Sequence, residues 1–345
     1  MKRLCLISRG FGESLSRGRL VASSGLILGG VGILGWALWS SLEPPPLPFD
    51  LTVGPATAAS LTDFSGVDPG ELKKLEIRTP DLKNPIATGV VWLAEGGRPT
   101  PLSWRNAVTE PVFFAEIDPA DSARVLSAIR EHVPADAVIL SWWDMSRRIR
   151  AIAGRQAPLD DPLARGLLTP AAWSAGAEAI TEKRRAFWGA GVPADQSEGF
   201  GKFIDALLMD EAQGATALAE LADGKEAFVA VHLADIWKAA AARPDLFAVA
   251  YKDFAGGGDA HGVMKAAREW MQENRIEGGF AVEPMGAAMR VHYLPQSADG
   301  QRLLALLLPF STSNPLALQR FELVFQHRGY WIYRLKAKKT ISTHE

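Results

Sequence analysis

The sequence predicts an α/β protein: a mixed sheet with flanking helices and a β-rich C-terminal part, preceded by one transmembrane helix. Three observations lead to this fold class. An uncharged stretch lies near the N-terminus, helical and strand-like segments alternate after it, and the chain beyond Gly278 is mostly strand-like. Alternating helices and strands are typical of α/β folds.

The transmembrane helix is predicted at residues 20–42, which contain no charged side chain. A helix rises about 1.5 Å per residue, so this segment can cross a hydrocarbon core of about 30 Å. Residues 1–19 form a basic tail, and basic flanks stay in the cytoplasm. We therefore expect the protein in the inner (cytoplasmic) membrane, with its N-terminus in the cytoplasm and its C-terminal body in the periplasm. The basic side chains of the tail are Lys2, Arg3, Arg9, Arg17 and Arg19.

Two alternatives to a retained anchor stay open. A cleaved signal peptide has an apolar core of about 7–15 residues and a cleavage site flanked by small residues. The uncharged stretch is longer, and the bulky Trp36 and Trp39 crowd the site near Ser40. A buried core helix is the other alternative, but the stretch is rich in glycine and uncharged on all sides. A mature N-terminus near residue 41 would identify a signal peptide.

The remaining chain is predicted to contain a Pro-rich linker at residues 43–70 and a periplasmic α/β body at residues 71–345. The whole chain has 37 basic and 39 acidic side chains, a net charge of −2. Nucleic-acid binding requires a clustered basic face, and the sequence shows no such cluster. The single cysteine, Cys5, lies in the basic tail. The body therefore carries no disulfide, thiolate metal site or covalently attached haem.

Periodicity and turn residues predict the elements of the body. The continuous apolar run at residues 137–143 is typical of a strand buried on both faces, and His327-Arg328-Gly329 suits a hairpin tip. Asp118 and Pro119 suit the start of a helix. The other strands are expected at residues 89–94, 112–117, 226–233, 247–251, 280–283, 288–294, 303–308, 321–326 and 330–336. Helices are expected at residues 118–132, 145–153, 169–188, 199–221, 235–242 and 260–274.

The candidate ligand-binding residues are Trp142, Trp143 and Asp144, which follow the apolar strand. Ligands of α/β proteins bind at the carboxyl ends of strands. The two indoles would form apolar walls, and the carboxylate would accept a hydrogen bond near the N-terminus of the next helix. The alternative is structural, because Asp is also a common N-cap and Trp a common core residue.

Other sites find little support in the sequence. The six histidines lack the spacing of a helical zinc site. Gly256-Gly257-Gly258-Asp259 precedes a helix and could bind an anion, but it lacks the spacing of nucleotide-binding loops, so a flexible loop is preferred. We assign no catalytic residue, no metal ligand and no cofactor.

Two resemblances rest on these residues. Ser141-Trp142-Trp143-Asp144 resembles the Trp-Trp-Asp-Tyr-Gly motif in the soluble domain of oligosaccharyltransferase catalytic subunits, and residues 321–335 look like their terminal hairpin. This similarity covers about residues 105–336. Met145 and Ser146 replace the motif's Tyr and Gly, and the membrane domain that holds that family's catalytic carboxylates is absent. The resemblance therefore implies the fold and a peptide-contacting site, and not the transferase activity.

The whole layout resembles the HaoB family of hydroxylamine-oxidation proteins. The shared features are the basic tail, the single span, the Trp-Trp-Asp-Met-Ser-Arg-Arg string at residues 142–148 and the Gly-Tyr-Trp-Ile-Tyr end at residues 329–333. This resemblance implies a membrane-anchored periplasmic protein with hydroxylamine oxidoreductase or its cytochromes as partners.

Three functional hypotheses follow. The preferred one is a non-enzymatic accessory or binding protein in hydroxylamine oxidation, part of ammonia oxidation. The second is an enzyme or peptide-binding domain derived from an oligosaccharyltransferase-like soluble domain, with Asp144 in its site. The third is a scaffold that holds a partner near the membrane.

Overall fold

The computed structural model describes residues 47–56, 71–93, 99–160, 168–188, 194–255, 259–285 and 288–336. The chain divides into two compact units, residues 1–46 and residues 47–345. The predicted cytoplasmic tail and transmembrane helix lie in the first unit, outside the described residues. Within the described ranges, none of the helices has the length and apolar character that crossing a membrane requires.

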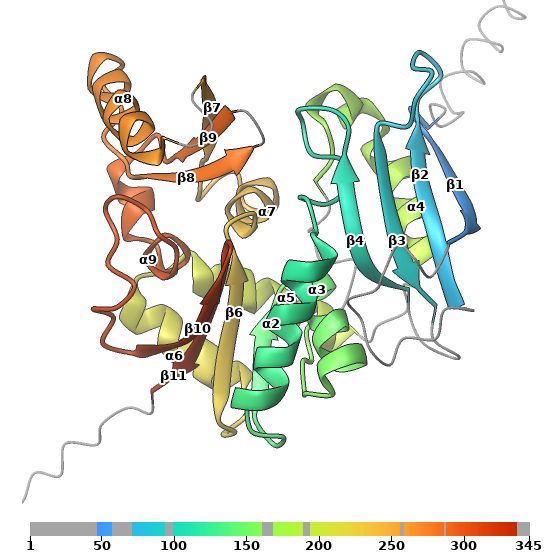
Figure 1. Ribbon diagram of the computed structural model, residues 1–345. Coiled ribbons are helices and arrows are strands. Elements are labelled where there is room, and N and C mark those ends of the chain that lie inside the picture. The colour runs from blue at the N-terminus through green and yellow to red at the C-terminus, as the bar shows by residue number, and fades with distance from the viewer. Residues whose placement is uncertain are drawn as a thin grey trace, which may run out of the picture. The chain divides into compact units, whose positions relative to one another are not determined.

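The first sheet is an antiparallel meander in the order β1-β2-β3-β4. Its strands are β1 (Asp50–Pro55), β2 (Leu72–Arg78), β3 (Ala87–Trp92) and β4 (Thr100–Asn106). β1 lies inside the segment predicted to be a linker, residues 43–70, and pairs with β2 along its whole length. Part of that segment therefore belongs to the folded body, and the body's sheet begins with it (Figure 1).

The second sheet is mixed and has the order β10-β11-β6-β5. Its strands are β5 (Val138–Ser141), β6 (Ala227–His232), β10 (Phe321–His327) and β11 (Tyr330–Leu335). β5 and β6 are parallel, whereas the other pairs are antiparallel. The sequence prediction of a mixed sheet is thereby confirmed.

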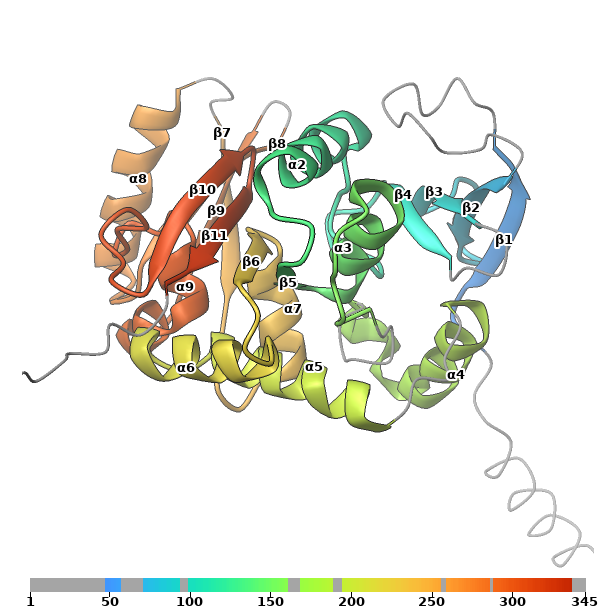
Figure 2. The ribbon, with the colours of Figure 1, turned by 90° about the horizontal axis from the view of Figure 1, so that it is seen from below.

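Helices cover both faces of the mixed sheet, as the continuous apolar run in β5 predicts. α5 (Ala194–Leu207) and α6 (Glu211–Leu221) cover one face, where they share a core cluster with Leu140 and Val229. α2 (Pro119–His132), α3 (Trp143–Arg148) and the π-helical turn η3 (Ile149–Ala153) cover the other, with Ile139 and Phe228. Figure 2 shows α5 and α6 on the side of the sheet opposite α2.

The remaining helical segments are η4 (Ala171–Gly176), α4 (Ala177–Trp188), α7 (Asp235–Ala242), η5 (Ser297–Gln301) and α9 (Leu303–Leu307). The helix expected at residues 199–221 is divided into α5 and α6, because Asp210 caps a new helix by accepting a hydrogen bond from the Gln213 amide. α2 begins at Pro119 with Asp118 as its N-cap, which confirms that prediction.

The third sheet is antiparallel, in the order β7-β9-β8, and carries α8 (Ala260–Glu273). Its strands are β7 (Ala250–Ala255), β8 (Phe280–Met285) and β9 (Ala288–Tyr293). Polar contacts join this sheet to α7. The Trp237 indole donates to His292 Nδ1 at 3.1 Å, and His292 Nε2 lies 2.8 Å from the carboxylate of Glu283.

Two predicted strands are wrong. Residues 303–308 form α9 instead, because Leu and Ala are strong helix formers and this run contains no β-branched residue. Residues 112–117 form only isolated bridges. Phe113 has a φ of 65°, which interrupts an extended strand. The Asn106 side chain replaces the missing ladder there, accepting from the Val112 amide and donating to the Phe114 carbonyl.

The last hairpin agrees with its prediction. β10 and β11 are joined through Arg328 and Gly329, whose φ angles are 38° and 81°. Two successive residues with positive φ form the turn that matches the twist of paired strands.

Candidate functional site

The candidate site lies where the parallel strands β5 and β6 end side by side. The chain leaves β5 into α3, which places Asp144 in the first turn of α3. It leaves β6 into α7, which places Asp235 at the first position of α7. Adjacent parallel strands therefore deliver two carboxylates to the same edge of the mixed sheet, the usual position of a ligand site in α/β proteins.

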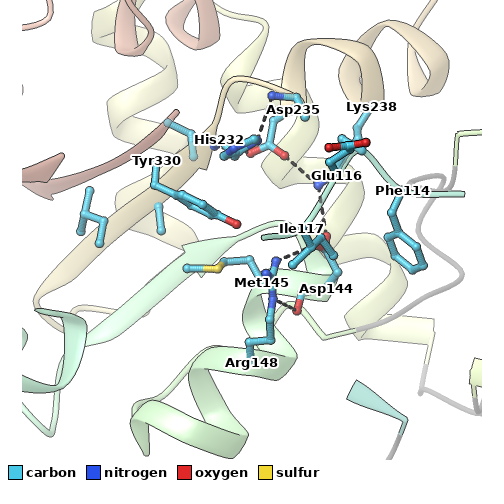
Figure 3. Close-up of a pocket in the computed structure, with 15 residues that line it drawn as sticks. Phe114, Glu116, Ile117, Asp144, Met145, Arg148, His232, Asp235, Lys238 and Tyr330 are labelled. Atoms are coloured by element: carbon cyan, nitrogen blue, oxygen red, sulfur yellow. Dashed lines mark hydrogen bonds and ion pairs between the residues drawn. The ribbon is translucent and has the colours of Figure 1, made fainter. Parts of the chain in front are cut away.

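Two cations compensate these carboxylates. Asp144 Oδ2 accepts a hydrogen bond from Arg148 at 2.9 Å, and Asp144 Oδ1 accepts one from Lys238 Nζ at 3.1 Å. Lys238 Nζ also lies 2.9 Å from Asp235 Oδ1. Figure 3 shows the resulting chain of contacts from α3 to α7. All four side chains are at most 6% exposed, so their charges interact in a medium of low polarity.

The network holds Asp144 and Lys238 in their charged forms. Burial by itself raises the pKa of Asp144, but Lys238 and Arg148 outweigh burial and hold that pKa below its usual value. Burial likewise lowers the pKa of Lys238, while Asp144 and Asp235 together raise it above its usual value. Neither group is therefore suited to exchange protons near neutral pH, which is what a general acid or base requires.

His232 stands at the end of β6 beside this network. Its Nδ1 accepts the Ala234 amide at 3.1 Å, and its own backbone amide donates to Asp235 Oδ2 at 2.8 Å. Burial lowers the pKa of His232. The imidazole is therefore neutral, with its proton on Nε2, and its ring packs against Tyr330 with the centroids 4.3 Å apart.

These side chains surround a small cavity of about 20 Å³. A buried water needs about 10–15 Å³, so the cavity has room for one or two molecules of that size. The polar part of its lining consists of Asp144, Arg148, His232, Asp235, Lys238, Tyr330 and Glu116.

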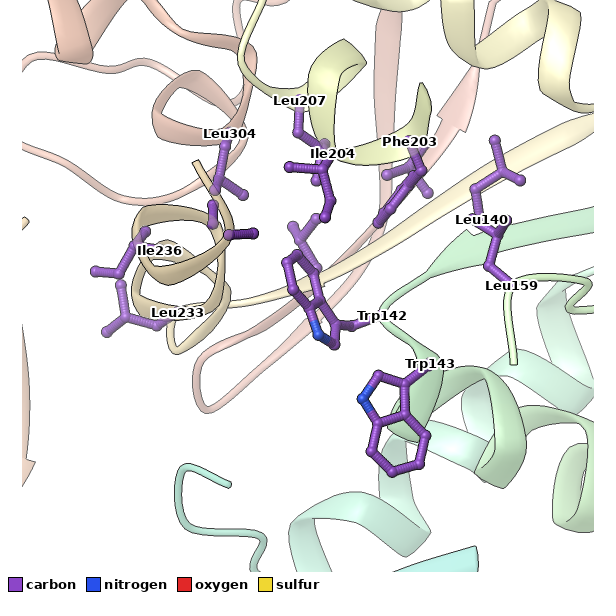
Figure 4. Close-up of a cluster of buried hydrophobic side chains, with 14 of the residues drawn as sticks. Leu140, Trp142, Trp143, Leu159, Phe203, Ile204, Leu207, Leu233, Ile236 and Leu304 are labelled. Atoms are coloured by element: carbon purple, nitrogen blue, oxygen red, sulfur yellow. The ribbon is translucent and has the colours of Figure 1, made fainter. Parts of the chain in front are cut away.

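Of the three residues predicted to bind a ligand, Asp144 lines this cavity and the two tryptophans do not. Trp142 is 1% exposed and packs edge-on against Phe200, with the ring centroids 5.2 Å apart. Trp143 is fully buried against Phe114 and Trp188. Figure 4 shows the two indoles pointing away from each other into the apolar interior. Ligand binding by these residues stays a prediction.

The alternative interpretation, that these residues are an N-cap and two core aromatic residues, agrees with the structure only in part. Asp144 does not cap α3, because the N-cap position is taken by Trp142, which makes no side-chain capping bond. The two indole N–H groups have no hydrogen-bond partner among the described residues. Both tryptophans therefore contribute to the core through ring packing.

Sequence reasoning did not identify Arg148, Asp235 and Lys238 as members of the site. A usable signal was present, because Asp144 and Arg148 are four residues apart and Asp235 and Lys238 three, and such pairs meet on one helix face. The contact between Asp144 and Lys238 joins residues 94 positions apart, and no local pattern predicts it.

Arg147 lies on the same helix, α3, and its charged side chain is buried. It is 3% exposed, and its guanidinium stacks on the Trp143 ring at 4.9 Å. It donates to the carbonyl oxygens of Asp160, Pro99 and Trp188 at 3.1, 2.7 and 2.9 Å. These carbonyls belong to three different segments of the chain, so Arg147 joins them at one point. The planar guanidinium, with its several donors, suits this role.

Comparison with models of protein families assigns the chain to a family. The model of the family described as HaoA-associated protein HaoB matches residues 16–335. The chain belongs to the HaoB family. That match covers the candidate site and also β10 and β11, the last two strands of the chain.

Solved structures with a similar arrangement include soluble domains of oligosaccharyltransferases. The C-terminal globular domain of the oligosaccharyltransferase from Archaeoglobus fulgidus matches with 14% identity and a TM-score of 0.30, over 63% of this chain and 97% of that chain. The C-terminal domain of C. jejuni PglB matches with 10% identity and a TM-score of 0.34, over 62% of this chain and 99% of that chain. The comparison with curated proteins found no match.

Proposed function

We propose that this member of the HaoB family is an accessory protein of hydroxylamine oxidation. In this proposal, residues 20–42 anchor it in the inner membrane, and its body binds hydroxylamine oxidoreductase, HaoA, or a partner cytochrome in the periplasm. The observation that carries the proposal is the family match over residues 16–335, because the family is described by its association with HaoA.

The sequence around the predicted span supports the proposed location. The uncharged stretch at residues 20–42 follows five basic side chains and one acidic side chain, Glu13. That asymmetry favours a cytoplasmic N-terminus. The family match begins at residue 16 and so includes the stretch.

The electrostatics of the candidate site favour binding over catalysis. Each oxygen of Asp144 accepts a hydrogen bond from a cation, and its pKa is held low. A general acid needs a raised pKa, and a general base needs an accessible carboxylate. The network joins α3 to α7 through buried ion pairs, and neither Asp144 nor Lys238 is poised for proton transfer.

The association is tested by purification of the tagged full-length protein from detergent-solubilised membranes. We expect co-enrichment of hydroxylamine oxidoreductase or its cytochromes, detected by haem absorbance and mass spectrometry. The control is an unrelated single-span protein with the same tag and a similar expression level. Equal recovery of these proteins with both baits would overturn the proposal.

A further inference from the structure

The cavity between α3 and α7 is lined by polar atoms with unused hydrogen-bonding capacity. A carboxylate offers about four lone-pair positions, and in Asp144 one cation occupies each oxygen. Lys238 has three N–H donors; two of them face Asp144 and Asp235, and Nζ also lies 5.4 Å from the centroid of the Trp142 ring. The Tyr330 hydroxyl lines the same cavity and has one O–H donor. In the described part of the chain, acceptor sites on a carboxylate and the O–H of Tyr330 therefore border the same space.

The charge of the lining limits what can enter. Among the buried side chains of the lining, the carboxylates of Asp144 and Asp235 balance the cations of Arg148 and Lys238. Glu116 is a third carboxylate in the lining, but it is exposed to solvent, so water screens its charge. A charged guest would lose its hydration and find no buried side chain whose charge is still unpaired. That loss is costly in a buried site. His232 adds no charge, because its Nδ1 accepts the Ala234 amide. A neutral guest therefore fits this lining better than an ion.

Size and opening complete the description of the guest. About 20 Å³ is the room that one or two waters need, so it suits a molecule of about two heavy atoms. Glu116 lines the same cavity and is exposed to solvent, so the cavity reaches the surface on the side of Glu116. A small guest has a path to the buried charges.

We propose that this cavity binds a neutral molecule of about two heavy atoms that both donates and accepts hydrogen bonds, the chemistry of uncharged hydroxylamine. The guest donates to Asp144 and accepts from the Tyr330 hydroxyl. The choice of hydroxylamine within this chemical class rests on the proposed function, whereas the site itself rests on the geometry of the cavity.

A series of guests with one head group and increasing size tests the proposal. Isothermal titration calorimetry would be carried out on the purified full-length protein at a pH at which the guests are uncharged. We expect saturable binding of hydroxylamine, weaker binding of O-methylhydroxylamine and none of O-benzylhydroxylamine. No binding of hydroxylamine, or equal binding of all three guests, would overturn the proposal.

A pair of matched variants locates the binding. Tyr330→Phe removes a hydroxyl from the lining, whereas Tyr333→Phe removes one that donates to the Leu307 carbonyl away from the cavity. We expect Tyr330→Phe to weaken hydroxylamine binding by about fivefold, the effect of one hydrogen bond, and Tyr333→Phe to leave it unchanged. Equal affinities in both variants would place the binding elsewhere and overturn the assignment.

This test is independent of the association with HaoA, because it uses the chain alone. Hydroxylamine binding without co-purification of the oxidoreductase would contradict the proposed function and leave the cavity assignment standing. Co-purification without hydroxylamine binding would contradict the cavity assignment alone. If Tyr330→Phe fails to fold, the size series on the unaltered protein still decides the outcome.

Discussion

Asp144 is the residue on which the two buried cations of the site depend. It is 2% exposed and contacts both Arg148 and Lys238. Removing it leaves two buried positive charges with Asp235 as the nearest remaining acid. We expect Asp144→Ala to lower the free energy of unfolding by about 3–5 kcal/mol, measured by urea denaturation. Exposed Asp136→Ala is the control and should change stability by less than about 0.5 kcal/mol. A similar small effect of both variants would contradict this role.

The same carboxylate predicts a dependence of stability on pH. The pKa of Asp144 is lower in the folded protein than its usual value. Its contribution is therefore fully present above the unfolded pKa of about 3.9 and is lost as the pH falls through the folded pKa. In urea denaturation at several pH values, the stability difference between wild type and Asp144→Asn should be constant from pH 7 to about pH 5. It should shrink below about pH 4. A difference independent of pH down to pH 2 would refute the prediction.

Arg147 predicts a different effect, because three of its hydrogen-bond partners are neutral backbone carbonyls. Lysine keeps the charge but cannot reach the carbonyl oxygens of Pro99, Asp160 and Trp188 together. We expect Arg147→Lys to lower the free energy of unfolding by at least about 2 kcal/mol, measured by chemical denaturation. Arg150→Lys on the adjoining helical turn is the matched control, because its side chain is 53% exposed. If both variants retain wild-type stability, the three contacts contribute little.

At the scale of elements, the turn between β10 and β11 depends on Gly329. Its φ of 81° disfavours any side chain, and a Cβ there would lie 2.9 Å from His232 Nε2. We expect Gly329→Ala to cost about 1–3 kcal/mol of stability, measured by thermal and chemical unfolding. Gly54→Ala in β1 is the control, since a Cβ at Gly54 meets no atom within 4 Å. Equal unfolding midpoints for the two variants would contradict the strain at the turn.

The sequence predicts elements well where the local pattern and the tertiary position agree. The apolar run of β5 and the turn of the last hairpin are such cases. It fails at Leu303–Leu307, where an apolar run of strand length forms α9, whose first amide donates to the Met209 carbonyl. It fails at residues 112–117 because the positive φ of Phe113 and the contacts of Asn106 depend on segments distant in sequence. Tertiary contacts decide both segments.

For the site, the sequence locates Asp144 at the correct end of a buried strand. From the sequence alone, Arg148 and Lys238 can each be paired only with an acid on the same helix. That α3 and α7 meet follows from the parallel pairing of β5 with β6. These two strands are separated in the chain by α3, η3, η4, α4, α5 and α6. The order of strands in the mixed sheet, with β11 between β6 and β10, likewise depends on pairings that no local pattern specifies.

At the scale of the whole molecule, the proposed anchor makes its own prediction. Replacing Leu28 and Leu34 by arginine puts two charges into the uncharged stretch, each costing about 2.5–3.5 kcal/mol in a membrane-spanning helix. We expect wild-type protein in the membrane pellet after alkaline carbonate extraction and a large part of the double variant in the supernatant. A matched double substitution to alanine should stay in the pellet. Complete extraction of the wild type would contradict the anchor.

The central claim is that the folded body binds hydroxylamine oxidoreductase. Biolayer interferometry with the purified full-length protein and the purified oxidoreductase tests it most directly. We expect saturable binding with a Kd in the micromolar range or tighter, about −8 kcal/mol or more favourable. An unrelated haem protein of similar net charge should give no saturable signal. A signal that rises linearly with oxidoreductase concentration, or one that the unrelated haem protein reproduces, would contradict the claim.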